Sequence, residues 1–139
     1  MKLSDIRIDT QAIEEGDWIG DLPFPGLEGV RLKVRGTGNA DYRRLQSKLL
    51  RGIAAKGLTP DREEEAAAAA TVELLHKTVL LDWDGIFQED GLAPLAFTPD
   101  LAAQLLADPE MRILRDAVIH AGNLVAARKK KAQGAAEKN

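Results

Sequence analysis

Two aspartates in one short stretch are the residues of this sequence best suited to chemistry. Asp82 and Asp84 stand in the string VLLDWDGI at 79–86, where an apolar run leads into Asp-x-Asp-Gly. Carboxylates at this spacing suit positions one and three of a twelve-residue calcium loop. Positions six and twelve would then hold Phe87 and Ala93, where that loop needs a glycine and a glutamate. The string therefore does not predict a calcium site.

The same string resembles the first motif of haloacid-dehalogenase-type phosphotransferases, a hydrophobic strand followed by Asp-x-Asp-Gly. The resemblance implies that Asp82 would be the nucleophile and Asp84 the acid/base, with a magnesium ion neutralising the phosphate charge. That fold also needs a parallel sheet, whose crossovers supply the other catalytic residues. Only 57 of the 139 residues follow Asp82, and their pattern predicts two helices that begin at prolines. Magnesium-dependent phosphotransfer through Asp82 is kept as a remote alternative.

A Gly-Thr-Gly-Asn string at 36–39 lies between a predicted strand and a predicted helix, as phosphate-binding loops do. The dinucleotide fingerprint needs a small residue where Asp41 stands, and a carboxylate there would repel a pyrophosphate. The two histidines, His76 and His120, lie among apolar neighbours on different predicted helices, which is typical of packed or surface residues. Cysteine is absent, which excludes thiolate zinc sites and cysteine nucleophiles. We expect no cofactor and no metal, and we predict that the protein is not an enzyme.

The composition favours helices as the elements that position these residues. Alanine and leucine, the best helix formers, number 21 and 19 of 139 residues, whereas only six residues are aromatic. Three segments, at 59–61, 98–100 and 108–110, combine a capping residue, a proline and an acid, which is the pattern of a helix start. Asn39 caps a further helix, which Gly57 ends. The predicted helices run from Asn39 to Gly57, from Thr59 towards Leu81, from Thr98 through Leu105, and from Asp108 through Val125.

Residues 1–36 show little helical periodicity. Apolar and basic side chains alternate over 30–35, which predicts a half-buried strand, and 17–20 is its candidate partner in an irregular hairpin. We therefore predict a mainly α fold, a small bundle of about four helices with an N-terminal β-hairpin or strand segment. Its predicted parts are the β segment 1–36, the helical domain 37–127 and a basic flexible tail, 128–139.

The stretch 82–97 is predicted to be a loop, with two glycines, one proline and a net charge of -4. It holds three of the six aromatic residues, Trp83, Phe87 and Phe97, which are the candidate partner-binding residues. Large apolar side chains usually pin an irregular segment onto a core, but exposed aromatics are typical of interface anchors. Full burial of both Trp83 and Phe97 would identify them as pins.

The charge distribution bears on partners. The net charge is -3 and the isoelectric point is about 5.4, although the last twelve residues carry five bases and one acid. Cations favour the negative end of a helix, which explains the basic string 128–131 without a ligand. No run of 18 apolar residues occurs, and the first ten residues lack the apolar core of a signal peptide. We expect neither nucleic acid nor a membrane as a partner.

Three stretches together resemble the tail assembly chaperones of long-tailed (siphovirus-type) bacteriophages and prophages. Residues 31–49 (RLKVRGTGNADYRRLQSKL) resemble the strand and first helix of that family. Residues 80–97 (LLDWDGIFQEDGLAPLAF) resemble its Asp-Trp-x-Gly loop, and residues 98–125 resemble its paired C-terminal helices, down to Ala-Gly-Asn at 121–123. Family members often place an aromatic residue directly after the last helix, where this chain has Ala-Ala-Arg-Lys at 126–129.

The resemblance implies a chaperone that binds the long, largely helical tape measure protein, keeps it soluble and helps recruit major tail protein during assembly of the tail tube. Such proteins leave before the virion is finished, so the expected location is the host bacterial cytoplasm and not the mature virion. Self-association and a longer form made by ribosomal frameshifting are further partner hypotheses. The alternative function is a structural virion component, such as a head–tail completion or minor tail protein.

Overall fold

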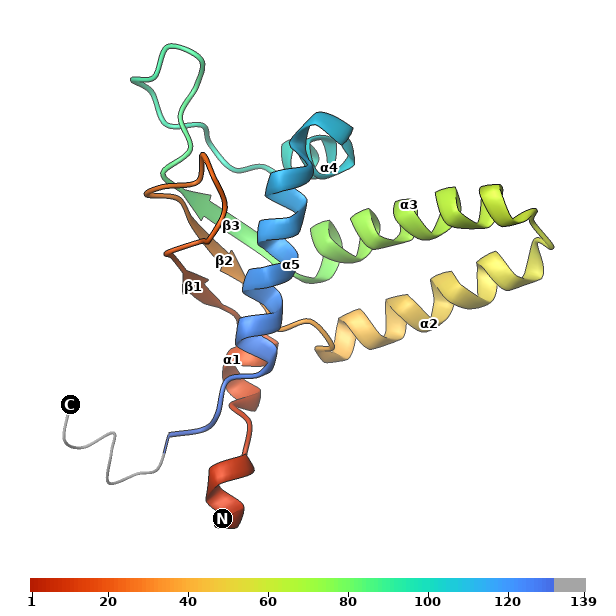
Figure 1. The fold of residues 1–139 in the computed structure, drawn as a ribbon, viewed down its shortest axis with the longest axis horizontal. Helices are drawn as coiled ribbons and strands as arrows, with labels where there is room; N and C mark the ends of the chain where they lie inside the picture. Colours follow the sequence, from red (N-terminus) through yellow and green to blue (C-terminus); the bar gives the residue numbers. More distant parts are fainter. Residues whose placement is uncertain (132–139) are drawn as a thin grey trace.

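The computed structural model describes residues 1–131, which form a three-stranded antiparallel sheet covered by helices, with a two-helix arm to one side (Figure 1). Residues 132–139, most of the predicted basic tail, lie outside the described residues. In chain order the elements are η1 (Leu3–Ile6), α1 (Thr10–Glu15), β1 (Asp17–Ile19), β2 (Arg31–Val34), α2 (Ala40–Ala55), α3 (Pro60–Thr78), β3 (Leu80–Asp84), α4 (Pro99–Ala107), η2 (Pro109–Met111) and α5 (Arg112–Ala126).

The prediction of a mainly α bundle is wrong, because the fold is mixed α/β. The predicted hairpin of β1 and β2 is confirmed, but β3 joins it as a third strand from within the predicted helical domain, 37–127. The second predicted helix was extended to Leu81, whereas α3 ends at Thr78. Val79 leaves the helical region at φ -120° and the chain continues as a strand. An apolar run of this length fits a helix or a strand equally well, and the tertiary pairing with β2 decides.

The sheet is ordered β1-β2-β3, so β2 is central and β3 lies at an edge. Leu32 and Val34 of β2 point to the covered face and are fully buried, whereas Arg31 is exposed. Between Lys33 and Val34 the pairing with β3 slips by one residue, a bulge that leaves Leu81 unpaired. Gly85 ends β3 with φ +84°, and a Cβ there would lie 2.4 Å from the carbonyl oxygen of Gly29.

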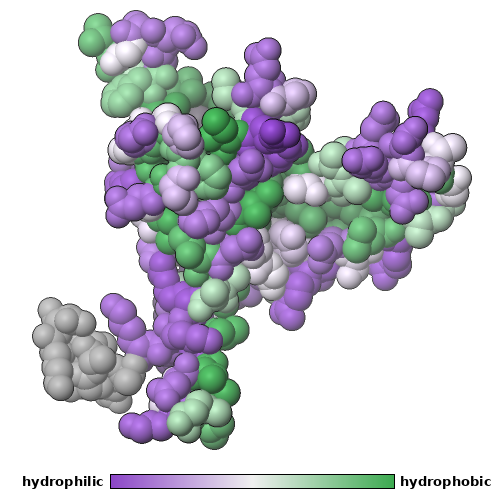
Figure 2. All heavy atoms as spheres, viewed as in Figure 1, coloured by the Kyte–Doolittle hydropathy of each residue, from purple (hydrophilic) through white to green (hydrophobic). Residues whose placement is uncertain are grey.

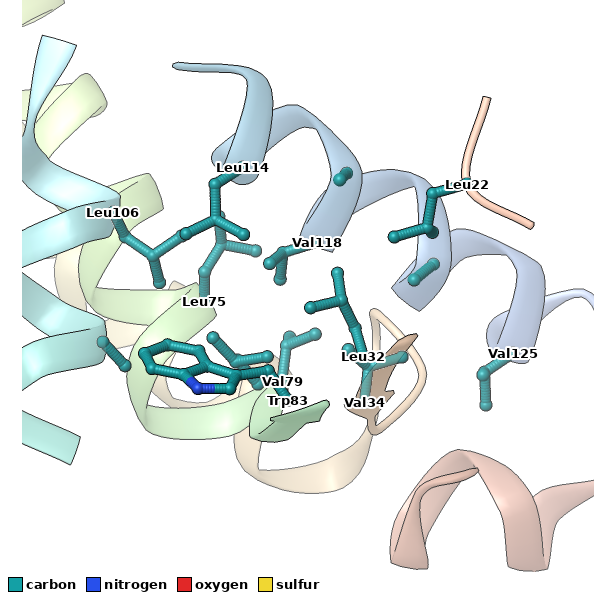
Figure 3. Close-up of a cluster of buried hydrophobic side chains, with 14 of the residues drawn as sticks. Leu22, Leu32, Val34, Leu75, Val79, Trp83, Leu106, Leu114, Val118 and Val125 are labelled. Atoms are coloured by element: carbon teal, nitrogen blue, oxygen red, sulfur yellow. The ribbon is translucent and has the colours of Figure 1, made fainter. Parts of the chain in front are cut away.

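Helices α4 and α5 and the last turn of α3 cover this face of the sheet and close the core around Leu32, Val34 and Trp83 (Figure 3). Along α5 three of the six buried residues are alanine or glycine, which permits close approach to the chain before α2. A Cβ on Gly122 would lie 2.9 Å from Thr37 Cγ2, so this contact depends on glycine. No described helix is long and apolar enough to cross a membrane.

The arm consists of α2 and the adjoining part of α3, residues 40–73, and projects away from the sheet (Figure 1). None of its residues is buried, and the first buried residue of α3 is Leu74, where the helix reaches the core. Tyr42 of α2 packs against the core, whereas the rest of the helix packs against α3. Helix α2 is not part of a bundle, which is the second respect in which the predicted architecture is wrong.

Asn39 joins the two ends of the arm to the core and is fully buried. Its Oδ1 accepts the backbone N–H of Tyr42 at 2.9 Å, which caps α2. Its Nδ2 donates to the carbonyl oxygens of Gly36 at 2.9 Å and Thr78 at 2.7 Å. One side-chain amide thus forms hydrogen bonds with the chain after β2, at the start of α2 and at the end of α3.

We expect Asn39→Ala to lower the free energy of unfolding by about 3 kcal/mol, because a helix cap is lost and buried carbonyl oxygens lose their donor. Urea unfolding followed by circular dichroism measures this loss. The matched control is Thr59→Ala, since Thr59 caps α3 without a side-chain hydrogen bond and its loss should cost less than about 0.5 kcal/mol. Similar losses in the two variants would contradict the role assigned to Asn39.

The ion pair of Asp17 with Arg128 makes stability depend on pH in the acidic range. The hydrogen bond from Arg128 holds the pKa of Asp17 below its ordinary value of 3.8. The folded state thus binds the proton more weakly than the unfolded chain. The pair stabilises the fold above pH 3.8, and this contribution is lost as the pH falls through the lowered pKa. The side chain of Arg128 is 33% exposed and that of Asp17 is 48% exposed. The ion pair therefore adds at most about 1 kcal/mol to the free energy of unfolding.

We expect Arg128→Gln to lower the free energy of unfolding at neutral pH by up to about 1 kcal/mol and to flatten its decline between about pH 5 and about pH 2. Urea titrations at several pH values measure both effects. Arg112→Gln is the control, because Arg112 makes no ion pair among residues 1–131. Identical pH profiles for the two variants would refute the assignment.

Candidate functional site

Asp82 and Asp84 lie on the outer face of the edge strand β3. Asp82 stands opposite Lys33 in the register, and the Asp84 carboxylate accepts a hydrogen bond from Arg31 at 2.8 Å. The two aspartates are two residues apart on this strand, and Trp83 between them points into the core. All strand pairings among the described residues are antiparallel, so the parallel sheet that the phosphotransferase resemblance requires is missing from 1–131. The aspartates occupy ordinary cross-strand positions there.

The Gly-Thr-Gly-Asn turn at 36–39 connects β2 to α2, and its backbone donors are in use. The N–H groups of Gly36 and Thr37 donate to the carbonyl oxygens of Ile13 at 3.0 Å and Gly122 at 3.1 Å. In a nucleotide-binding loop these N–H groups would point to a phosphate. Here they bond to the backbone of α1 and α5, so the turn holds these segments together.

The two histidines lie in different surroundings and are not joined into a site. His120 packs edge-on against Phe24, with ring centroids 5.7 Å apart. Burial lowers the pKa of His76, which lies on α3, so its neutral form is favoured. Among the described residues no group of three or more histidines and acids is placed to hold a metal ion.

Of the three aromatic candidates, Trp83 is a structural pin. It is 6% exposed, its Nε1 donates to the carbonyl oxygen of Leu95 at 2.7 Å, and its ring meets Phe97 edge-on at 4.8 Å between centroids. Phe97 is half-buried against the core. Together these contacts hold the start and the end of the 82–97 stretch on the sheet.

Phe87 is the aromatic candidate that remains exposed, at 53%. It lies on the loop 85–97, which projects beyond the end of β3, and Leu92 on the same loop is 83% exposed (Figures 1 and 2). The loop therefore carries two exposed apolar side chains, whose contact with water is unfavourable.

The tip of this loop is ordered by its own hydrogen bonds. Phe87 and Pro94 form a β-bridge, and the N–H of Gln88 donates to the carbonyl oxygen of Ala93 at 2.8 Å. The Asp90 carboxylate accepts from the N–H groups of Leu92 and Ala93, which lowers its pKa. The apolar side chains are thus presented on a defined backbone, and binding there would cost little ordering entropy.

The arm carries a second apolar surface, a groove of about 380 Å³ between α2 and α3. Its apolar lining comes from both helices, and three charged residues also border it. The apolar or small residues are Leu49, Gly52, Ile53, Ala66, Ala69 and Ala70, and the charged ones are Lys48, Lys56 and Glu73. Figure 2 shows hydrophobic residues along the arm among hydrophilic ones.

The two helices of the arm are oppositely charged. Helix α2 has four cations and one acid, a net charge of +3, whereas α3 has five acids and two cations, a net charge of -3. The cations of α2 also line a shallow hollow on its outer side, where Arg43, Arg44, Lys48 and Arg51 gather. No ion pair among the described residues joins α2 to α3.

The family model of the YdaY prophage protein matches residues 37–139, which is most of the chain. The chain belongs to the YdaY prophage protein family. The match to the YdaY model begins at the turn before α2, so it includes the arm, the loop 85–97 and α5 but not β1 and β2. No curated protein and no solved structure matches the chain significantly.

Membership of the YdaY family confirms the phage or prophage character that the sequence resemblance implied. The description of the family as a prophage protein does not extend to a role in tail assembly.

The sequence interpretation missed the arm as a surface. Cations at 43, 44, 48 and 51 recur on one side of a helix, and this spacing was the available signal. The groove gave no comparable signal, because the apolar positions of α2 have the same period as those of a core helix.

We expect Trp83→Ala to lower the free energy of unfolding by about 3 to 5 kcal/mol, as for other large side chains removed from cores. Phe97→Ala, at a half-buried position, should cost about 2 kcal/mol. Phe87→Ala should change stability by less than about 0.5 kcal/mol, because its side chain is exposed. Urea unfolding of the three variants measures these values, and a large loss in Phe87→Ala would show that the loop surface belongs to the core.

Proposed function

We propose that this YdaY family protein is a non-enzymatic tail assembly chaperone that binds the tape measure protein. The observation that supports this proposal best is the apolar pair Phe87 and Leu92, held exposed on the ordered loop 85–97. Under this proposal the two side chains become buried at the interface with the client, which removes apolar surface from water.

The physical requirements of the proposed client agree with this surface. A very long, largely helical protein exposes apolar stripes that aggregate unless they are covered. A small protein with one short apolar contact site covers a limited stretch, so many copies bind along the client. Each contact is weak, which allows tail subunits to displace the copies one at a time.

Under this proposal the protein also helps recruit major tail protein to the growing tube, acts in the host bacterial cytoplasm and is absent from the mature virion. It works without catalysis, and this part of the proposal is supported by the positions of Asp82 and Asp84 on the outer face of an antiparallel edge strand.

We expect the double variant Phe87→Ser/Leu92→Ser to lose most of its binding to the tape measure protein of the same prophage, because its apolar contacts are removed. Co-expression, affinity capture and quantification of soluble tape measure protein measure this loss. The control is Leu124→Ser, which removes an apolar side chain 49% exposed on α5. Equal binding by both variants would reject the loop as the client site.

Induction of the prophage tests the wider role. The wild-type protein should be present in lysates and absent from purified particles. A stoichiometric amount in mature particles would instead identify a structural virion component.

A further inference from the structure

We propose that a second copy of this chain docks on the groove of the arm, so that two arms form an antiparallel four-helix arrangement with two-fold symmetry. This inference concerns a different surface from the loop 85–97 and does not depend on the identity of the client.

The first support is the incomplete packing of the arm. Residues 40–73 form two helices of several turns without one buried residue, and Leu50 is 55% exposed. Most helical stability in proteins comes from packing an apolar face, and two helices packed only on each other bury little. The groove between them is open, and its lining of alanines and Gly52 permits another helix to approach closely.

The second support is the charge of the two helices, which is +3 on α2 and -3 on α3. None of the ion pairs in the described part of the chain connects the two helices, and Glu73 pairs with Lys77 of its own helix at 3.5 Å. Equal and opposite charges on neighbouring elements make a surface complementary to a copy of itself. A polyanion such as nucleic acid would be attracted by α2 but repelled by α3, so the charge pattern favours a second copy.

Two-fold symmetry determines which residues meet. A symmetry axis along the arm places α2 of each copy opposite α3 of the other, as in an isologous interface. Lys48 of α2 and Lys56, the residue that caps its C-terminal end, border the groove on one side, and Glu73 of α3 borders it on the other. In this arrangement the lysines of one copy approach the acidic helix of the other, while the alanines and Ile53 form the apolar centre.

Such a dimer would present two loops 85–97 to a client. Linked binding sites raise the effective concentration at the second contact, so weak loop contacts would give useful avidity on a long partner.

Sedimentation equilibrium on the full chain tests the proposal. We expect a mass twice the 15.1 kDa of the monomer at about 100 µM. Ala69→Arg places a charge in the groove and should weaken the dimer by at least about tenfold. Ala68→Arg is the matched control, because Ala68 is exposed on the same helix but does not line the groove. Circular dichroism shows whether both variants remain folded.

A charge exchange tests the pairing itself. Lys48→Glu/Lys56→Glu and Glu73→Lys should each weaken self-association, whereas an equimolar mixture of the two variants should form a heterodimer. A monomeric wild-type chain, or a dimer unaffected by Ala69→Arg, would overturn the proposal. A monomeric Ala69→Arg variant should also bind tape measure protein more weakly, because it presents one loop 85–97 in place of two. If Phe87→Ser/Leu92→Ser did not reduce binding of the client, the proposed function would fail, but the sedimentation measurements would still test the dimer.

Discussion

The hydrogen bonds of one buried amide hold the arm on the sheet. Asn39 leaves no polar atom unsatisfied, because its oxygen caps α2 and its nitrogen donates to the chain at both Gly36 and Thr78. A buried polar group without partners costs free energy, so these bonds favour one arrangement of the three segments. This junction fixes the start of α2 beside the end of α3, at the point where the arm leaves the core.

The Gly-Thr-Gly-Asn string, which resembles a phosphate-binding loop, lies at the same place. The turn 36–39 packs against Gly122 of α5, and Thr37 Oγ1 donates to Asn123 Oδ1 at 2.6 Å. Residues that look like a phosphate loop in the sequence are therefore explained by close contact between backbone segments. The surfaces available to partners, the loop 85–97 and the arm, lie away from this junction.

Helix starts could be predicted from the sequence because their signals are local. The prolines at 60 and 99 stand at the first residues of α3 and α4, and Pro109 begins a short 3-10 turn that leads into α5. Strand β3 could not be predicted, since an apolar run after a helix has two local solutions and only its pairing with β2 selects one. The same limit applied to the aromatics: Trp83 and Phe87 are four residues apart in one predicted loop, yet one is a pin and the other is exposed. Their difference comes from the strand that ends between them.

The alanine-rich arm has a consequence for how this family can change. Because no residue of 40–73 is buried and only Tyr42 and Val72 of this range pack against the core, most substitutions there alter the surface while they leave folding largely intact. The alanines of α3 have high helix propensity, so its outward positions accept many side chains. The core and the Asn39 junction are constrained by packing, whereas the arm is free to acquire new specificity. Under the proposed dimer, substitutions in this one hairpin would alter which copies pair while leaving the core and the loop 85–97 unchanged.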